Sequence, residues 1–261
     1  MIKLEAIRHN KIWGWEDWLA STHPNGLQQE FVDFCGGSHP LLVKVIQADD
    51  VLSVQVHPND EQAARYGLAH GKTECWYVLQ ANEGARLVCG LKCKCTPSQI
   101  KQAIAGGTLE ELLSWQEVSA GDFVYIPAGT VHAIGGGMRL LEVQQSSDVT
   151  LRLYDWGRGR ECDIERASQC VNCDTPISVA PFALKFACEY FALEEVRVRR
   201  GQCLSLKASS HHAAVVFVLH AGGGAAIGGE SAQAEDAFAF AVDETIDLTG
   251  DIRAMLIEAR G

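Results

Sequence analysis

The sequence has few basic residues. Its 22 Lys and Arg stand against 33 Asp and Glu, which gives a formal net charge of −11 at pH 7. Nucleic acids and anionic membranes are bound through basic faces, so this balance argues against both classes of partner. A small anionic substrate is still possible, but it would need a local group of basic side chains.

Long apolar segments are also missing. The N-terminal segment MIKLEAIRHNKIWGWEDW lacks the apolar core of a secretion signal, and the longest apolar run, at 213–219, is too short to cross a bilayer. Without an export signal, the ten cysteines are expected to be reduced thiols in the cytoplasm. The close pairs Cys93/Cys95 and Cys170/Cys173 have no second half at zinc-site spacing, so we interpret them as ordinary thiols.

What the chain does have is enough length and apolar content for a folded core. It contains 261 residues, of which 47% are hydrophobic and 21% charged, a composition typical of one or two globular domains. A chain of this size buries about three quarters of its unfolded surface, so folding requires no metal or disulfide.

Short β-branched or aromatic runs separated by turn residues predict a mainly β protein built as an antiparallel sandwich or barrel. The earlier runs are at 41–46, 52–57, 75–79, 123–126, 138–144 and 149–154, and the later ones at 186–188, 190–193, 213–219, 237–242 and 253–257. A stretch with Pro176 and few apolar runs separates the two groups. We therefore predict a first domain at 1–160, a linker at 161–178 and a second, smaller β domain at 179–261.

Two helical signals interrupt the strands. Thr96 precedes Pro97 as a cap before a proline at the first helical position, which predicts a helix over 98–105. Thr108 and Glu111 have capping-box spacing, which predicts a second helix over the apolar residues that follow. Both helices are expected to cover a sheet edge and to carry no chemistry.

Residues with metal-binding chemistry recur at a spacing of two. Gln55 and His57 can share one face of a strand, as can Lys72 and Glu74. In GDFVYIPAGTVH, a Pro-Gly turn precedes His132, and this spacing closely resembles the second motif of the cupin superfamily. Two histidines and a carboxylate on neighbouring strands suit a divalent metal with open coordination positions.

Four blocks in order resemble the motifs of the type I mannose-6-phosphate isomerases, also called phosphomannose isomerases. They are LSVQVHPND, HGKTECWYVL, GDFVYIPAGTVHAIG and LLEVQQSSDVTLRLYDWGR, and the similarity runs from about residue 12 to residue 160. The resemblance implies a cupin (jelly-roll) β-barrel with small helical additions, followed by a second cupin-like β domain. It also implies a zinc-dependent enzyme that interconverts D-mannose 6-phosphate and D-fructose 6-phosphate through a cis-enediol. The chain is similar to the compact bacterial-type members, which lack a large helical insertion.

The resemblance assigns roles to individual residues. The family's zinc ligands fall on Gln55, His57, Glu74 and His132, with one Zn²⁺ per subunit. The active-site arginine falls on Arg152.

Further positions line the substrate pocket in the family. Lys44, Ser53 and Lys72 fall on positions that help to hold the phosphate, together with Arg152. Glu142 falls on a pocket carboxylate. Isomerisation needs a base that moves a proton between C2 and C1, and the residues alone leave both Glu142 and Lys72 as candidates.

Two other functions fit the same residues. A non-catalytic, sugar-sensing cupin would bind metal and sugar without turnover. An iron-dependent cupin oxygenase also uses two histidines and a carboxylate, although Gln55 as a fourth ligand disfavours it. Arg152 also has a structural alternative, an ion pair with Asp155 or Glu161. The predicted partner is a small sugar phosphate, and the sequence leaves open whether the protein is a monomer or a small homo-oligomer.

Overall fold

The computed structural model describes residues 1–172 and 177–260, and the chain divides into two compact units. Unit 1 comprises Met1–Ile7, Asp17–Lys44 and Ala183–Gly261, and unit 2 comprises Arg8–Glu16 and Val45–Phe182. The protein is mainly β with antiparallel pairing, as predicted. The division at 1–160, 161–178 and 179–261 stays a prediction, and the contact-based units place two N-terminal segments with the C-terminal strands.

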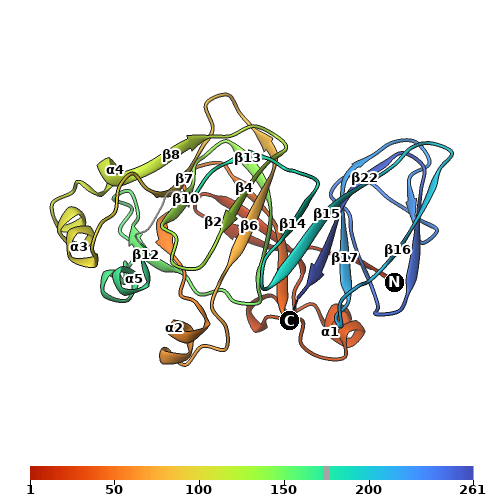
Figure 1. The fold of residues 1–261 in the computed structure, drawn as a ribbon, viewed down its shortest axis with the longest axis horizontal. Coiled ribbons are helices and arrows are strands. Elements are labelled where there is room, and N and C mark those ends of the chain that lie inside the picture. The colour runs from red at the N-terminus through yellow and green to blue at the C-terminus, as the bar shows by residue number, and fades with distance from the viewer. Residues whose placement is uncertain (173–176, 261) are drawn as a thin grey trace. The chain divides into compact units, whose positions relative to one another are not determined.

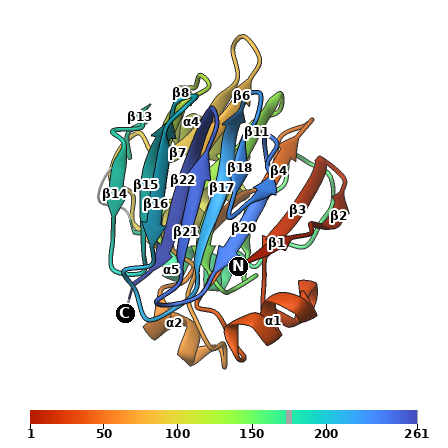
Figure 2. The same ribbon diagram turned by 90° about the vertical axis from the view of Figure 1, so that its right-hand side faces the viewer.

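Unit 1 is built from two antiparallel sheets within its described residues. The larger has the order β1-β20-β17-β22-β15-β14, with bounds Ile2–Leu4, Ala237–Phe240, Ala214–Ala221, Ile252–Ala259, Phe191–Val198 and Lys185–Ala187. The smaller has the order β16-β21-β18-β19, with bounds Cys203–Lys207, Thr245–Thr249, Ala226–Ile227 and Glu230–Ser231. Val216 and Phe238 from the larger sheet share one core with Ile246 and Leu248 from the smaller. Figure 2 shows β15, β22, β17 and β20 running side by side.

The N-terminal part of unit 1 also contains a short 3-10 turn, Pro24–Gly26, and helix α1, Gln29–Cys35. The helix ends at Gly36, whose left-handed backbone conformation favours glycine.

Unit 2 also contains two sheets. A five-stranded sheet has the order β12-β5-β10-β7-β8, with bounds Leu151–Tyr154, Val54–Val56, His132–Ile134, Arg86–Leu91 and Leu113–Glu117. The other has the order β13-β9-β6-β11-β4-β3-β2, with bounds Ala180–Pro181, Asp122–Ile126, Glu74–Ala81, Met138–Gln145, Leu41–Ala48, Gly14–Ala20 and Ile7–Lys11. The strands β4, β3 and β2 each have residues in both units.

Side-chain alternation gives the five-stranded sheet two different faces. Val54 and Val56 of β5, together with Leu151 and Leu153 of β12, pack in an apolar cluster on one side. Gln55, which lies between the two valines, must point to the opposite side, because successive side chains in a strand alternate. We call this opposite side the inner face, and it is turned toward the sheet that contains β6.

Three helices cover the other face of the five-stranded sheet. They are α3 (Pro97–Ala105), α4 (Leu109–Leu112) and α5 (Ile164–Cys170), and they lie at one end of unit 2 in Figure 1. Ile100, Leu109 and Ala167 from these helices join the apolar cluster behind β5 and β12. The prediction that helices cover a sheet edge was therefore wrong, since they seal a face.

The two capping predictions had different outcomes. Thr96 and Gln99 form the full capping box of α3: the Thr96 hydroxyl accepts from the Gln99 backbone N–H, and Gln99 Oε1 accepts from the Thr96 N–H. The second helix is only one turn, and Thr108 makes no capping hydrogen bond. Leu113 and Trp115 instead enter β8 and pair with β7, so long-range pairing overrides the local helix signal.

The segment 161–178, predicted as a linker, contains α5, whose N-cap Asp163 accepts from the Arg166 N–H. Cys170, one member of a predicted thiol pair, ends this helix, whereas Cys173 lies outside the described residues. None of the helices in the described ranges is long and apolar enough to cross a membrane.

The turn after β12 carries a buried carboxylate that binds two arginines. Asp155 accepts hydrogen bonds from Arg160 Nε at 2.7 Å and from Arg158 Nη2 at 2.8 Å. These bonds, the one from Arg160 first, hold the pKa of Asp155 below its usual range. Asp155 is thus paired with Arg158 and Arg160, so it is not the structural partner of Arg152.

The same turn is fastened to the chain just before β5. Arg158 Nη1 donates to the Val51 carbonyl at 2.7 Å, and Trp156 Nε1 donates to the Leu52 carbonyl at 2.6 Å. Because this turn follows β12 and Leu52 precedes β5, the two adjacent strands are locked in register. Residues on β5 and β12 therefore keep a fixed spacing.

We predict that Asp155→Asn destabilises the protein by about 2 kcal/mol at pH 7, because it leaves two arginines without their carboxylate. The folded-state pKa is depressed, so the stabilisation is present above the unfolded value near 3.8 and is lost as pH falls through the folded value. Chemical unfolding of both proteins at pH 7 and in acid should show the difference shrinking in acid. The control is Asp243→Asn, which removes only an exposed pair with Lys207. Equal stability of wild type and Asp155→Asn at pH 7 would show that the pairs of Asp155 with Arg158 and Arg160 do not stabilise the fold.

Candidate metal and active site

His57, Glu74 and His132 converge on the inner face of unit 2. Each offers a ligand atom, and these atoms lie within 4.8 Å of one another. His132 Nε2 is 3.4 Å from Glu74 Oε1, and His57 Nε2 is 3.6 Å from Glu74 Oε2. All three side chains are at most 1% exposed. The structure thus brings together three of the four predicted zinc ligands in a geometry that can hold one ion.

The ligands come from both sheets of unit 2. His132 opens β10 and Glu74 opens β6, while His57 directly follows β5. His132 is the register partner of Gln55, and Arg152 of β12 is the partner of Gln55 on its other side. Because directly paired residues share a face, Arg152, Gln55 and His132 form one row across three strands.

The donor set accepts a cation in this structure. The Lys72 ammonium lies 2.7 Å from Glu74 Oε2 and 3.1 Å from His57 Nε2, and it is 3.8 Å from Glu142 Oε1. A carboxylate and two imidazoles are a common donor set for zinc and for other first-row divalent metals. The residues therefore fit a bound metal. In this structure the Lys72 ammonium is the positive charge that contacts the ligand atoms of Glu74 and His57.

Gln55, the fourth predicted ligand, lies next to the cluster. Its Nε2 is 3.2 Å from His132 Nε2. Only the amide oxygen of a glutamine can bind a cation, so coordination would use the other orientation of this amide group. A half-turn of the side-chain amide exchanges the two atoms without moving the strand.

His132 is oriented and kept neutral by its surroundings. Its Nδ1 lies 2.8 Å from the Thr130 carbonyl, which assigns the ring proton to Nδ1 and leaves Nε2 as the electron-pair donor toward the cluster. Burial lowers the pKa of His132 from 6.5 to about 4, against the opposing effect of the Thr130 bond. At neutral pH the ring is therefore an uncharged ligand.

Glu142 lies on β11 behind this cluster and is 2% exposed. Its Oε2 accepts a hydrogen bond of 2.7 Å from Trp76 Nε1, and its Oε1 faces the Lys72 ammonium. The structure therefore places both predicted base candidates, Glu142 and Lys72, at one site.

The remaining predicted residues differ in what the structure says of them. Arg152 lies in the row with Gln55, and its buried Nε has no hydrogen-bond partner among the described residues. Ser53 is buried two residues before Gln55. Lys44 belongs to unit 1, where its ammonium lies 5.8 Å from the centre of the Trp18 ring.

Two residues at the site were not singled out from the sequence. Trp76 is two positions after Glu74 on β6, so strand alternation places it on the same face. Thr130 is two positions before His132 and contributes only its carbonyl. The spacing of two between Glu74 and Trp76 could have indicated Trp76 from the sequence. The contact of Thr130 uses a backbone carbonyl, which every residue has, so the residue type gives no signal for it.

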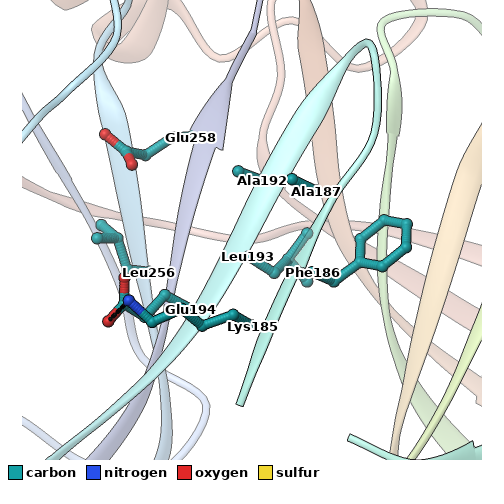
Figure 3. A pocket seen from close by; sticks show the side chains of 8 residues that line it. All are labelled: Lys185, Phe186, Ala187, Ala192, Leu193, Glu194, Leu256 and Glu258. Carbon is teal, nitrogen blue, oxygen red and sulfur yellow. Dashed lines mark ion pairs between the residues drawn. The ribbon is translucent and has the colours of Figure 1, made fainter. Parts of the chain in front are cut away.

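Unit 1 has a separate groove of about 240 Å³ on β14, β15 and β22, shown in Figure 3. Its charged residues already have partners. Lys185 pairs with Glu194 at 2.8 Å, and Glu258 accepts from the Ser209 hydroxyl at 2.9 Å. The charged side chains of the groove are therefore engaged in local pairs, and we do not assign a catalytic centre there.

Known proteins are similar to this chain in sequence and in fold. Residues 2–91 match the family model "Phosphomannose isomerase type I, catalytic domain". A mannose-6-phosphate isomerase of Streptococcus mutans is 38% identical over 221 residues, which cover 68% of this chain and 70% of the relative. The chain belongs to the mannose-6-phosphate isomerase family. It is therefore an enzyme, an isomerase of that family.

Other members of the mannose-6-phosphate isomerase family agree. ManA of Bacillus subtilis is 48% identical over 124 residues, or 47% of this chain and 39% of the relative. The crystal structure of a mannose 6-phosphate isomerase from Bacillus subtilis superimposes with a TM-score of 0.83 over 98% of this chain and 99% of that one, at 23% identity. The predicted cupin-like, mainly β fold of this family is confirmed.

We predict that Glu74→Gln lowers the affinity for Zn²⁺ or Co²⁺ by at least about 100-fold, because the carboxylate links both histidines at the cluster. Calorimetry with Zn²⁺ and the visible spectrum of added Co²⁺ would measure this. Glu110→Gln is the matched control, since that carboxylate accepts only a surface bond from the Tyr154 hydroxyl in the described contacts. Unchanged affinity in the folded Glu74→Gln protein would show that the metal is held elsewhere.

Proposed function

We propose that this enzyme interconverts D-mannose 6-phosphate and D-fructose 6-phosphate through a cis-enediol and that it depends on zinc. The observation that carries the proposal is the convergence of His57, Glu74 and His132 with Lys72 and Glu142 on one buried face. Membership of the mannose-6-phosphate isomerase family supports the choice of substrate. A zinc ion is the proposed form of the metal, because two imidazoles, a carboxylate and an amide oxygen suit it.

Gln55, His57, Glu74 and His132 would hold the ion in the loaded enzyme. When bound there, it would supply a Lewis acid that polarises the sugar carbonyl and offsets the negative charge of the enediolate. The hydrogen bond between His132 Nδ1 and the Thr130 carbonyl orients Nε2 to serve as a metal ligand.

Proton transfer between C2 and C1 requires a base close to both carbons. We assign this role to Glu142, because a carboxylate can accept the proton and its Oε1 is turned toward the cluster. The Lys72 ammonium is a hydrogen-bond donor beside it and would stabilise charge on the neighbouring sugar oxygens. The two candidates left open by the sequence thus receive complementary roles.

Anion binding is proposed for the basic residues. The formal charges of Lys72 and Arg152 offset those of Glu74 and Glu142, so a divalent ion would add positive charge at the site despite the acidic chain. Arg152 has a rigid fork of N–H donors suited to phosphate or enediolate oxygen. Lys44 and Ser53 as phosphate-holding residues stay predictions, as do one zinc ion per subunit, a cytoplasmic location and a monomer or small homo-oligomer.

The two competing functions predict different observations. A sugar-sensing cupin would bind fructose 6-phosphate without converting it, and an iron-dependent oxygenase would consume oxygen. Both Lys72 and Glu142 lie next to the metal-ligand candidates, which favours turnover over simple binding.

We predict that wild type catalyses the isomerisation in a coupled assay, loses activity to a chelator and regains it with Zn²⁺. Arg152→Ala is expected to lower kcat/KM by about 100-fold or more, because it removes donors aimed at developing or fixed negative charge. Arg197→Ala is the control, since this exposed side chain pairs with Glu195 in unit 1. Metal-loaded wild type that neither isomerises nor binds either sugar phosphate would overturn the proposed function.

A further inference from the structure

Trp76 and Glu142 form a buried pair across two neighbouring strands. They are register partners on β6 and β11, so their side chains rise from the same face. The indole Nε1 donates to Glu142 Oε2 at 2.7 Å, and the two side chains are 0% and 2% exposed. A buried carboxylate needs such a donor, because burial deprives it of water.

The indole ring is itself held on several sides. It meets the His132 ring edge-on, with centroids 5.4 Å apart and planes at 72°. Leu87, Val124 and Ile126 belong to the same buried apolar cluster. In a close-packed interior such a large ring cannot turn without moving its neighbours, so the direction of its N–H is fixed.

The fixed N–H has a consequence for the two oxygens of Glu142. Oε2 is committed to the indole, whereas Oε1 is the oxygen on the side of Lys72, 3.8 Å from its ammonium. We propose that Trp76 is a positioning residue that holds the Glu142 carboxylate in one rotation, so that Oε1 is the atom presented to the substrate. This inference rests on the proposed function, because it gives Glu142 the proton-transfer role.

A ring without the N–H separates positioning from packing. Trp76→Phe keeps an aromatic ring against His132 but removes the indole N–H that donates to Glu142 Oε2, so the carboxylate gains rotational freedom. Misorientation of a reacting group lowers the rate of the chemical step more than it weakens substrate binding. We therefore expect kcat to fall about 10-fold to 100-fold, while KM for mannose 6-phosphate changes by less than about 3-fold.

Four further measurements distinguish a structural role of Trp76 from a positioning role. Zinc content and the calorimetric affinity for fructose 6-phosphate should remain at wild-type values in Trp76→Phe. Trp115→Phe, on β8 and facing Trp156 and Arg86, is the control for loss of an indole. In a double-mutant cycle, Trp76→Phe should add little to the loss already caused by Glu142→Gln, because both changes act through one carboxylate.

The proposal is overturned if Trp76→Phe retains wild-type kcat, or if its effect adds in full to that of Glu142→Gln. A fall in zinc content that matches the fall in activity would also overturn it, since Trp76 would then support the metal ligands instead. These outcomes differ from failure of the proposed function, in which wild type itself would show no isomerisation.

A second feature of unit 2 is independent of this site. Cys93 and Cys95 lie between the end of β7 and Thr96, the cap of α3, and their sulfur atoms are 3.8 Å apart. Cys93 is exposed, whereas Cys95 is 6% exposed and belongs to the apolar cluster that contains Ile100. One thiol is thus open to small molecules and the second lies within contact of the first.

We further propose that this pair is a redox-active dithiol that exchanges with low-molecular-weight disulfides of the glutathione type. The Cys93 thiolate attacks the small disulfide, forms a mixed disulfide and releases one small thiol. The Cys95 thiolate then attacks the Cys93 sulfur, which forms the Cys93–Cys95 bond and releases the second small thiol. Two protein thiols are oxidised and one small disulfide is reduced to two thiols, which carry away the two protons.

The test treats reduced protein with oxidised glutathione, followed by alkylation and peptide mass mapping. It is done in a Cys203→Ser background, which removes the other exposed cysteine of the described chain. The 93–95 peptide should lose both thiols and retain no glutathione, and a dithiol reductant should restore them. In Cys95→Ser, and in Cys95→Ala as a second variant, glutathione should accumulate on Cys93. A stable glutathione adduct on Cys93 with Cys95 present, or no reaction at either thiol, would overturn the proposal.

Discussion

The buried charge between the two sheets of unit 2 is the constraint on which the site depends. Lys72, Glu74 and Glu142 are each at most 5% exposed, and an unpaired charge at such depth would be strongly destabilising. They are tolerated because each has a partner: Lys72 forms an ion pair with Glu74, and Trp76 Nε1 donates a hydrogen bond to Glu142. Removing one member weakens the compensation of the charges that remain. Glu74 therefore has two roles, as a metal-ligand candidate and as the ion-pair partner of Lys72.

The rest of unit 2 serves to keep this polar interior in register. The five-stranded sheet has its inner face toward the charges, while the other face is sealed by the apolar sides of α3, α4 and α5. The Asp155 turn ties the beginning of β5 to the end of β12, and thus fixes the spacing between Gln55 and Arg152. Rigidity of this kind matters more for proton transfer than for binding, since small displacements of a reacting group lower the rate.

The elements that the sequence predicted well are those whose partners are local. Thr96 caps α3 because its partner Gln99 is three residues away. Thr108 carries the same local signal, yet the chain after it joins β8, where Leu113 and Trp115 pair with Leu91 and Val88 of β7. The helix at Asp163 was missed although the cap was present in the sequence. Composition alone indicated a linker there.

The sequence by itself determined which chemistry is available and on which faces it lies. The spacing of two in Gln55/His57 and Lys72/Glu74 follows from strand geometry, and the turn before His132 follows from its Pro and Gly. Only the tertiary structure decided which groups meet. Lys72 pairs with Glu74, and Trp76 donates to Glu142. Asp155 binds Arg158 and Arg160, and it does not pair with Arg152. The Asp155 pairs depend on how the turn after β12 folds back on itself. The contacts of Glu74 and Glu142 depend on sheet register and packing. These are set by contacts between distant segments, for which the local pattern of residues carries no signal.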